Sequence, residues 1–370
     1  MLYGNKNVTI NIMKIGIFDP YLDTVGGGEK YMLTIAQCLS KTHDVSIFWD
    51  LDNENIKKLV LKRFALDLSS IQFRKNIFSS HVPLAERVSI ARKYDTIIYL
   101  SDGSLPLIGK KNLIVHFQFP VEWVNGHSVV TKLKLLQVKK IICNSQFTKT
   151  YIDKKFNVSS TILYPPVDIL SSDTKKKEQI ILHVGRFGID REGANYKKQD
   201  VMINVFKTMV KNGLVGWRFF LIISVQENDK EKLQNLKEMT KGFPIEIVEN
   251  PNNTVLHAFY KKAKIYWHAS GFGEDLSKYP EKAEHFGIAT VEAMGAGVVP
   301  VAINAGGQKE IVQDGENGFL WNTIDELIEK TSLIIKNTIL LEKLSLQACK
   351  DAKQFNVDRF CEEINKIVYE

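Results

Sequence analysis

Short apolar runs alternate with amphipathic stretches along almost the whole chain, and this alternation constrains the fold most strongly. In the first half we predict a helix over 29–40 and strands at 14–18, 44–48, 96–100, 112–116 and 140–143. In the second half we predict helices over 199–211 and about 289–296, and strands at 179–184, 218–224, 245–248, 264–268 and 298–303. Strands that alternate with helices form βαβ units around a parallel sheet. We therefore expect an α/β protein with two Rossmann-like, doubly wound parallel-sheet domains.

A domain boundary is predicted near the middle of the chain, because 370 residues exceed what one hydrophobic core usually covers. Prolines, serines and a lysine run interrupt the pattern at 164–168 and 171–178, which we interpret as a linker. The expected parts are an N-terminal domain over 1–168, a C-terminal domain over 177–345, and a helical tail over 346–370 that packs back toward the first domain after a break near Phe355 and Asn356. In such a pair of domains, ligands bind in the cleft at the carboxyl ends of the strands.

The formal charge of +7 comes from the first half, where 22 Lys and Arg face 14 Asp and Glu through Leu170. A basic surface of this kind can meet nucleic acid, anionic lipid or an anionic substrate, and it can also be an ordinary solvated surface. No aromatic residues interleave with the lysines as they do in single-strand binders, so no nucleic-acid partner is expected.

The four cysteines are Cys38, Cys143, Cys349 and Cys361; they lie far apart without a CxxC pair, so we expect reduced core residues of a cytoplasmic protein. No stretch approaches the ~18–20 apolar residues that span a bilayer, and no charged-then-apolar signal layout begins the chain. Residues 1–12 precede Met13, which opens a strand, and are interpreted as an extension or a misplaced start.

The most informative segment is 284–297, in which Glu284 and Glu292 flank the start of a predicted helix. The first amides of that helix, near Phe286, Gly287 and Ile288, have no intrahelical partners and suit an anion such as a pyrophosphate. Glu284 is then placed to accept hydrogen bonds from sugar hydroxyls, and Glu292 from a ribose. A surface helix with incidental acids is the plainer alternative.

The segment resembles the family 4 glycosyltransferases, which have the GT-B fold. Their E-x7-E motif matches Glu284 and Glu292, and the following apolar-Pro strand, the turn at Gly306 and Gly307, and the EIV-x-DG-x-NG-F segment over 310–319 match as well. The resemblance covers nearly the whole chain and implies a nucleotide-sugar-binding C-terminal domain and an acceptor-binding N-terminal domain.

A second element follows the first strand of the C-terminal domain. It contains Arg186 and then Lys197 and Lys198, and in the resembled family an Arg and a Lys here bind the donor diphosphate. Cations stabilise the charge that develops on a departing diphosphate. The register of the following helix favours Lys197 over Lys198, and the insertion over 188–196 is longer than usual. The alternatives are a strand-end salt bridge for Arg186 and a surface role for the lysine.

In the first half, the GGGE run from Gly26 to Glu29 opens a helix, and Gly27 and Gly28 are expected near the donor phosphates. This form resembles mannosyltransferases of the lipid-linked oligosaccharide type. His116 ends a strand, and the resemblance assigns it to positioning or polarising the donor sugar, with a structural role as the alternative. The NSxxT turn at 144–148 and the segment around His268 also resemble family features, with helix capping and a core role as their alternatives.

The resemblance implies a retaining, metal-independent hexosyltransferase. Its catalytic residues would be Arg186, Lys197, Glu284 and His116, and its donor-binding residues Gly27, Gly28, Phe286, Gly287, Ile288 and Glu292. Asp50 and Asp52 spell the D-x-D of metal-dependent transferases but follow a strand away from the expected diphosphate site, so no metal is assigned.

We expect no cofactor beyond the donor, GDP-mannose or UDP-glucose. The expected acceptor is a glycan or a lipid-linked glycan in polysaccharide biosynthesis, with possible peripheral contact of the basic N-terminal domain with the inner face of the membrane. The alternatives are a UDP-sugar 2-epimerase or a phosphorylase of the same fold, or a non-catalytic nucleotide-sugar-binding protein.

Overall fold

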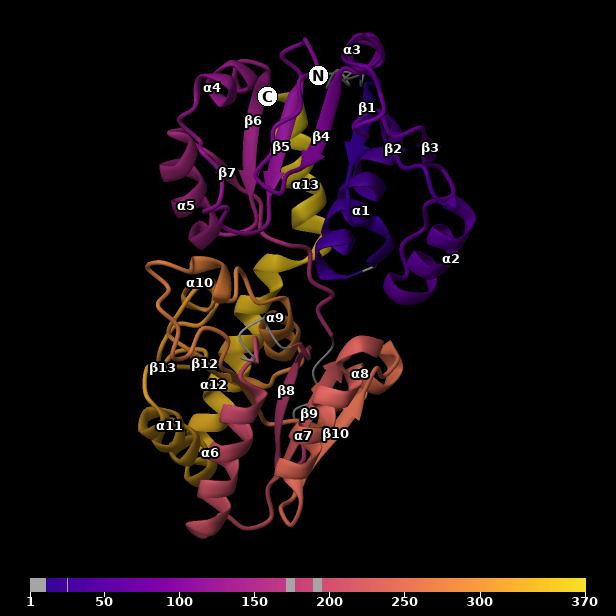
Figure 1. Ribbon diagram of the computed structural model, residues 1–370. Helices are drawn as coiled ribbons and strands as arrows, with labels where there is room; N and C mark the ends of the chain where they lie inside the picture. Colours follow the sequence, from indigo (N-terminus) through magenta and orange to yellow (C-terminus); the bar gives the residue numbers. More distant parts are fainter. Residues whose placement is uncertain (1–10, 25, 171–176, 189–194) are drawn as a thin grey trace, which may run out of the picture. The chain divides into compact units, whose positions relative to one another are not determined.

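The computed structural model describes residues 11–24, 26–170, 177–188 and 195–370. The chain forms two compact units (Figure 1). The first contains the chain through Cys143, residues Tyr151–Leu163 and the C-terminal residues Phe360–Glu370; the second contains Asn144–Thr150 and Tyr164–Arg359. Parts of the predicted N-terminal extension, of the linker at 171–178 and of the insertion at 188–196 lie outside the described residues.

The first unit contains a seven-stranded parallel sheet with the order β3-β2-β1-β4-β5-β6-β7. Its strands are β1 (Lys14–Phe18), β2 (Asp44–Phe48), β3 (Gln72–Arg74), β4 (Thr96–Leu100), β5 (Leu113–Phe117), β6 (Val138–Cys143) and β7 (Thr161–Ile162). The helices along this part of the chain are α1 (Gly27–Ser40), α2 (Asn53–Phe64), α3 (Leu84–Ala91), α4 (Val129–Leu135) and α5 (Gln146–Phe156). Because β4 and β5 are buried along their whole length, both read as continuous apolar runs in the sequence.

The C-terminal helix α13 (Val357–Tyr369) packs into a core of the first unit through Phe360, Ile364, Ile367 and Val368. A disulfide between Cys38 of α1 and Cys361 of α13, with their Cα atoms 5.2 Å apart, joins the two helices. The prediction that all four cysteines are reduced is therefore wrong for this pair. The two cysteines are separated by 323 positions, so only the tertiary packing of α13 against α1 brings them together.

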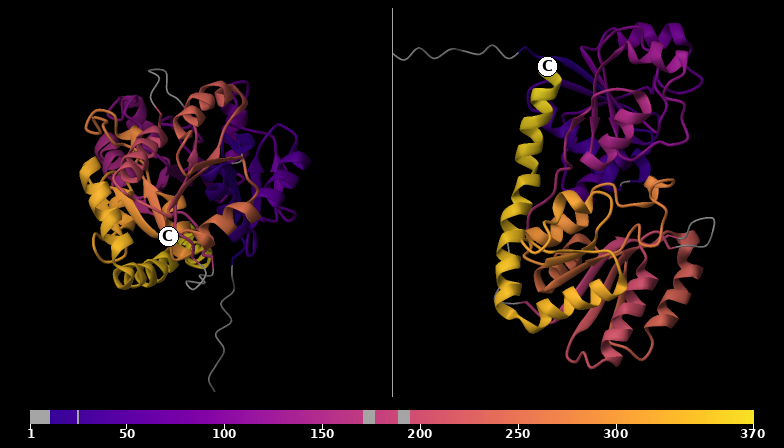
Figure 2. Two further views of the ribbon diagram at one scale, coloured as in Figure 1. Left: turned by 90° about the horizontal axis from the view of Figure 1, so that it is seen from below. Right: turned by 90° about the vertical axis from the view of Figure 1, so that its left-hand side faces the viewer.

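The second unit contains a six-stranded parallel sheet with the order β10-β9-β8-β11-β12-β13 and helices on both sides (Figure 2). Its strands are β8 (Ile180–Arg186), β9 (Arg218–Ser224), β10 (Ile245–Glu249), β11 (Ile265–His268), β12 (Val299–Ile303) and β13 (Phe319–Trp321). Its helices are α6 (Gln199–Lys211), α7 (Lys230–Thr240), α8 (Asn253–Lys262), α9 (Ile288–Gly295), α10 (Gln308–Ile311), α11 (Ile324–Lys336) and α12 (Thr338–Ala352). Separate apolar clusters fill the two faces of the sheet.

The predicted α/β class with two parallel Rossmann-like sheets is confirmed. The predicted break in the tail is also confirmed, because a single 3₁₀ turn, Lys353–Phe355, separates α12 from α13. Among the described residues, no helix combines the length and the apolar character that a membrane span requires.

Candidate active site

The loop before α9 is held in an unusual conformation by close packing. Gly287 has a φ of 124°, and a Cβ there would lie 2.3 Å from Nε2 of Gln308. The turn at Gly306 and Gly307 packs against the same loop, since a Cβ at Gly306 would meet the carbonyl oxygen of Glu284 at 2.2 Å. The amide of Gly307 donates to that oxygen at 2.8 Å. The Gly-Gly turn of the motif therefore fixes the loop that leads into α9.

Gln308 and Thr290 brace this loop from behind. The hydroxyl of Thr290 donates to Oε1 of Gln308 at 2.9 Å, and Nε2 of Gln308 donates to the carbonyl of Phe286 at 3.5 Å. Both side chains are fully buried. The start of α9 is thus preorganised, and its first amides, which lack intrahelical acceptors, face away from the helix body.

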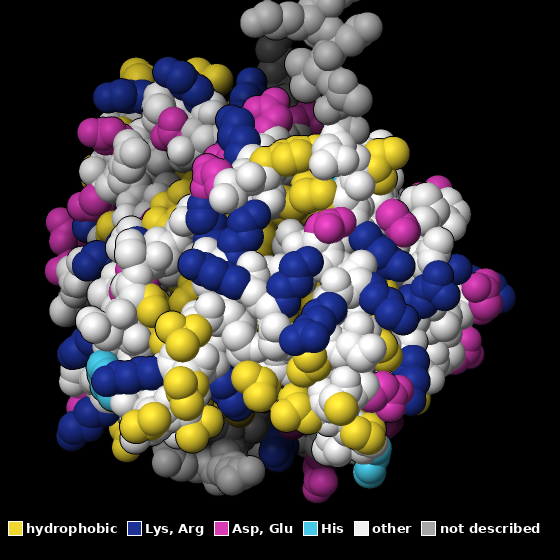
Figure 3. Space-filling view, turned by 90° about the horizontal axis from the view of Figure 1, so that it is seen from above, with side chains coloured by type: hydrophobic (Ala, Val, Ile, Leu, Met, Phe, Trp, Pro, Cys, Tyr) yellow, Lys and Arg dark blue, Asp and Glu magenta, His cyan; other side chains and the backbone are white. Residues whose placement is uncertain are grey.

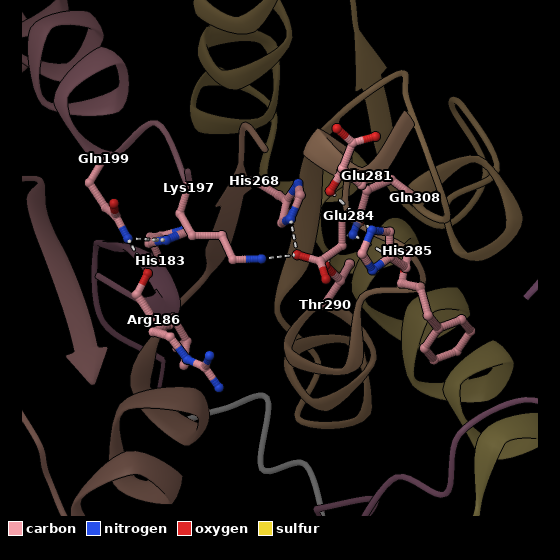
Figure 4. Close-up of polar contacts among 12 residues, drawn as sticks. His183, Arg186, Lys197, Gln199, His268, Glu281, Glu284, His285, Thr290 and Gln308 are labelled. Atoms are coloured by element: carbon pink, nitrogen blue, oxygen red, sulfur yellow. Dashed lines mark hydrogen bonds and ion pairs between the residues drawn. The ribbon is translucent and has the colours of Figure 1, made fainter. Parts of the chain in front are cut away.

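Glu284 joins this loop to the loop between β8 and α6. Nζ of Lys197 and Nε2 of His268 both approach Oε2 of Glu284, at 2.7 and 3.0 Å (Figure 4). Burial raises the pKa of Glu284, but Lys197 and His268 more than offset this and hold it well below its usual range. Burial lowers the pKa of His268 against the opposing effect of Glu284. Glu284 is therefore an anion that accepts hydrogen bonds from two sides.

Arg186 ends β8 with an exposed side chain, and no ion pair joins its guanidinium to a carboxylate of the described residues. Its backbone is fixed from behind, because Nε2 of Gln199 donates to the carbonyl of Arg186 at 3.2 Å. His183, on the same strand, is fully buried, and burial lowers its pKa to about 3. The guanidinium is thus available to an anionic ligand, while a neutral layer of His183 and Gln199 supports it (Figure 4).

Lys197 and Lys198 are neighbours in sequence with different partners. Lys198 has a left-handed φ of 55°, and its Nζ lies 2.5 Å from Oε1 of Glu274, which also binds Lys282 at 3.1 Å. The Lys198 and Glu274 side chains are 13% and 15% exposed, so this pair is occupied in holding the segment after β11. Lys197 instead reaches Glu284.

Glu292 lies one helical turn inside α9. The hydroxyl of Tyr260, from α8, donates to Oε2 of Glu292 at 2.9 Å and lies 3.3 Å from the carbonyl of Ala289. Tyr260 is fully buried and Glu292 half-buried. Of the predicted residues, the second unit thus brings together Arg186, Lys197, Glu284, Phe286, Gly287, Ile288 and Glu292 along one edge of its sheet.

The glycine-rich run lies in the first unit. α1 begins at Gly27, two residues before the predicted start, because Glu29 accepts a hydrogen bond from the amide of Gly26 at 2.5 Å and so caps the helix. A Cβ at Gly28 would lie 2.3 Å from Oε1 of Gln118, whose Nε2 donates to the Gly28 carbonyl at 3.0 Å. The run and the segment after β5 are therefore in direct contact.

His116, at the end of β5, is fully buried beneath Tyr31, with the rings stacked at 4.2 Å. Nδ1 of His116 lies 3.2 Å from the carbonyl of Ile142, and its Nε2 has no hydrogen-bond partner among the described residues. Burial lowers the pKa of His116 to about 3, so the ring is neutral near pH 7.

The side chains of Asp50 and Asp52 both accept hydrogen bonds from backbone amides of the first unit. Asp50 accepts a hydrogen bond from the amide of Asn76 at 2.8 Å, and Asp52 caps α2 by accepting from the amide of Asn55 at 3.1 Å. No group of three potential metal ligands is found within the described residues. The absence of a metal role for these two residues stays a prediction.

The comparisons with known proteins decide the class of enzyme. Residues 168–351 match the family model described as "Glycosyl transferases group 1". The chain is 26% identical over 451 aligned residues to a GDP-Man:Man(3)GlcNAc(2)-PP-Dol alpha-1,2-mannosyltransferase of Dictyostelium discoideum, covering 99% of this chain and 86% of that protein. This chain is a glycosyltransferase.

Two further likenesses extend over almost the whole glycosyltransferase. It is 23% identical to a Campylobacter jejuni GalNAc-alpha-(1->4)-GalNAc-alpha-(1->3)-diNAcBac-PP-undecaprenol alpha-1,4-N-acetyl-D-galactosaminyltransferase, with 97% of this chain and 99% of that protein covered. The structure of Anabaena Alr3699/HepE in complex with UDP and glucose superposes with a TM-score of 0.69 at 19% identity, covering 96% and 99% of the two chains. The fold is therefore GT-B, and the chain is similar to the lipid-linked oligosaccharide mannosyltransferases.

Sequence reasoning missed several residues that support the glycosyltransferase's site. Gln308 and Thr290 lie within the recognised motif. The Gly-Gly turn before Gln308 was a usable signal that two backbone segments pack closely there. Tyr260 and Gln199 lie on amphipathic helices, where nothing in the pattern distinguishes them from other core-facing positions.

Proposed function

We propose that this glycosyltransferase transfers a hexosyl group with retention of configuration, without a metal ion. The donor is a nucleoside diphosphate sugar, GDP-mannose first and UDP-glucose second, and the acceptor is a glycan or lipid-linked glycan. The observation that carries the proposal is the contact of Lys197 with Glu284 at 2.7 Å, beside the start of α9. This contact places a cation that can bind a phosphate next to an anion that can accept hydrogen bonds from sugar hydroxyls.

Each residue then has a distinct task. The exposed guanidinium of Arg186 and the first amides of α9 bind the diphosphate, and Lys197 shifts from Glu284 toward it as charge develops. Glu284, held ionised, accepts hydrogen bonds from the hexose, and Glu292, oriented by Tyr260, accepts those of the ribose. His116 is neutral and is proposed to position or polarise the sugar, which requires that Tyr31 uncover its buried ring.

The proposed reaction is a same-face displacement. The bond from the anomeric carbon to the diphosphate oxygen breaks, the acceptor hydroxyl attacks from the same side, and its proton passes to the departing phosphate. No side chain is needed as a covalent nucleophile, so the protein contributes positioning and charge stabilisation. The absence of a metal requirement is tested by dialysis against EDTA, after which full transferase activity is expected; activity restored only by a divalent cation would overturn this part.

The donor is tested by a thermal-shift panel of GDP, UDP, ADP and their sugar conjugates, because a ligand that binds the folded state raises the unfolding temperature, and at equal ligand concentration a tighter ligand raises it more. We expect a shift with GDP-mannose or UDP-glucose that is lost in Arg186→Ala. The names of the mannosyltransferase relatives favour GDP-mannose.

The rival functions differ from sugar transfer in what they require and in what they do to the donor. A 2-epimerase would change a UDP-sugar without any acceptor, a phosphorylase would require inorganic phosphate, and a non-catalytic binding protein would leave the donor intact. Product analysis of donor incubated with and without a lipid-linked glycan separates all three from transfer. We also propose that the basic first unit contacts a membrane that carries the acceptor.

A further inference from the structure

Helix α4 presents apolar side chains to solvent. Val129, Val130, Leu133 and Leu136 are 73%, 61%, 58% and 70% exposed, and none of the seven helical residues is buried. At 3.6 residues per turn, Val129, Leu133 and Leu136 lie along one stripe with Val130 beside it. A helix of a globular unit normally turns such a stripe toward the core, so this one is inverted.

The helix is nevertheless firmly built. Ser128 caps it by accepting a hydrogen bond from the amide of Thr131 at 3.1 Å, and Thr131 donates to the carbonyl of Asn125 at 3.1 Å. At its other end, Oε1 of Gln137 accepts from the amides of Ile108 and Gly109 at 2.6 and 2.7 Å. The exposed stripe is therefore a fixed feature of the fold.

Lysines border the apolar stripe. Lys132 and Lys134 lie at its two edges on the helix, and the loop fixed by Gln137 continues into exposed Lys110 and Lys111. Between residues 106 and 136 the chain has four lysines and one acid, Glu122. Glu122 is paired with Lys155 at 2.9 Å, so it does not neutralise the lysines of α4. Leu107, 38% exposed on the same loop, extends the apolar area.

Figure 3 views the molecule from the end at which α3 and α4 lie in Figure 1. It shows hydrophobic side chains gathered beside lysine and arginine side chains, with few acidic ones among them. We call the surface formed by Leu107, Lys110, Lys111 and residues 129–136 the α4 surface. It lies at the edge where β5 and β6 begin, because Leu113 and Val138 follow the loop and the helix directly.

We propose that the α4 surface docks on a membrane containing anionic lipid, with α4 lying in the plane of the interface. Apolar side chains flanked by lysines match such a membrane, because the former enter the acyl boundary while the ammonium groups reach lipid phosphates. A protein partner fits less well, since lysine is depleted at protein interfaces. The α4 surface supplies the residues for the membrane contact proposed above. This inference rests on the proposed function only in taking a membrane as the partner.

Docking through α4 would also fix which edge of the first unit's sheet faces the membrane. Gly28 and His116 lie at the carboxyl ends of its parallel strands, and the α4 surface lies at their amino ends. Docking through α4 therefore turns the edge with Gly28 and His116 away from the lipid. An acceptor glycan would have to extend from the membrane to reach it.

The test is sedimentation of the full chain with vesicles of phosphatidylcholine alone and with about 30% phosphatidylglycerol. We expect binding to the anionic vesicles that weakens as salt rises. Val130→Glu/Leu133→Glu and Lys132→Ser/Lys134→Ser should each lower the partition coefficient by about tenfold or more. The matched controls are Ile339→Glu, at an 80% exposed apolar position of α12, and Lys336→Ser/Lys343→Ser, which should bind like the parent.

Three results would overturn the proposal: no binding to anionic vesicles, equal binding by the α4 variants, or a dimer in solution that Val130→Glu/Leu133→Glu converts to monomer without any vesicle binding. The last would make the surface an interface between copies of this chain. The donor-induced thermal shift is measured on the same variants. It should be unchanged, so failure of membrane docking and failure of the proposed donor site are distinguishable.

Discussion

Replacing Gly287 by alanine should damage both stability and donor binding. A non-glycine residue at a φ of 124° costs about 1–3 kcal/mol, because few side chains adopt this region. The new Cβ would also lie 2.3 Å from Nε2 of buried Gln308, whose displacement breaks its bond from Thr290 and leaves a buried amide unsatisfied, at about 1–3 kcal/mol. The sum is about 2–6 kcal/mol, which corresponds to a drop of roughly 5–20 °C in the Tm of a unit of this size.

Gly213→Ala is the matched control. Gly213 has a φ of 97°, but a Cβ there would meet nothing within 4 Å, so that variant has only the backbone cost. Scanning calorimetry and donor titration of both variants separate the two effects. We expect the larger drop in Tm and the loss of donor binding only in Gly287→Ala. Equal Tm values for the two variants, or parental donor affinity in Gly287→Ala, would refute the packing argument for the loop before α9.

Three further predictions follow from the site. Arg186→Ala should lower kcat by about 10²–10³ with an unchanged Tm, because the side chain is exposed and supports no described ion pair; near-parental turnover would remove it from the diphosphate site. Lys197→Ala should reduce transfer strongly, whereas Lys198→Ala should mainly lower Tm through loss of the Glu274 pair, and the reverse pattern in paired activity and melting assays would exchange their roles. Acidification should destabilise the second unit, because burial lowers the pKa of His183 to about 3 and of His285 to about 4. At these two histidines the unfolded chain binds up to two more protons, so stability present above pH ~6.5 is lost as pH falls, by up to ~2.7 kcal/mol per pH unit, and the lowered pKa of His268 acts in the same direction. Urea denaturation between about pH 7 and 4.5 measures that slope, which His183→Gln should lower by up to ~1.4 kcal/mol per pH unit; a flat profile in the parent would contradict the buried, neutral histidines.

Much of the architecture was predictable because the long strands are buried on both faces. β1, β2, β4 and β9 have the predicted bounds, since their apolar runs end where the polar loops begin. β3, β7 and β13 have two or three residues each, too few to establish a period, and they were missed. The Cys38–Cys361 disulfide was missed because it depends on the docking of the last helix, which no local pattern encodes.

The site was predictable as a set of segments but not as a network. The E-x7-E spacing identified Glu284 and Glu292, yet it could not show that Lys197 and His268 share one oxygen of Glu284. The register of the following helix favoured Lys197 over Lys198, but the different partners of the two lysines depend on a left-handed backbone angle at Lys198, which no sequence pattern shows. Backbone geometry of single residues is decided by tertiary packing, and this is where sequence patterns carry the least information.

The most direct test of the central claim is a crystal structure of the second unit's site with GDP or UDP bound. The account predicts diphosphate oxygens within about 3 Å of the first amides of α9 and of the guanidinium of Arg186, with Lys197 drawn away from Glu284. A nucleotide bound elsewhere, or a diphosphate that leaves the start of α9 and Arg186 uncontacted, would contradict it.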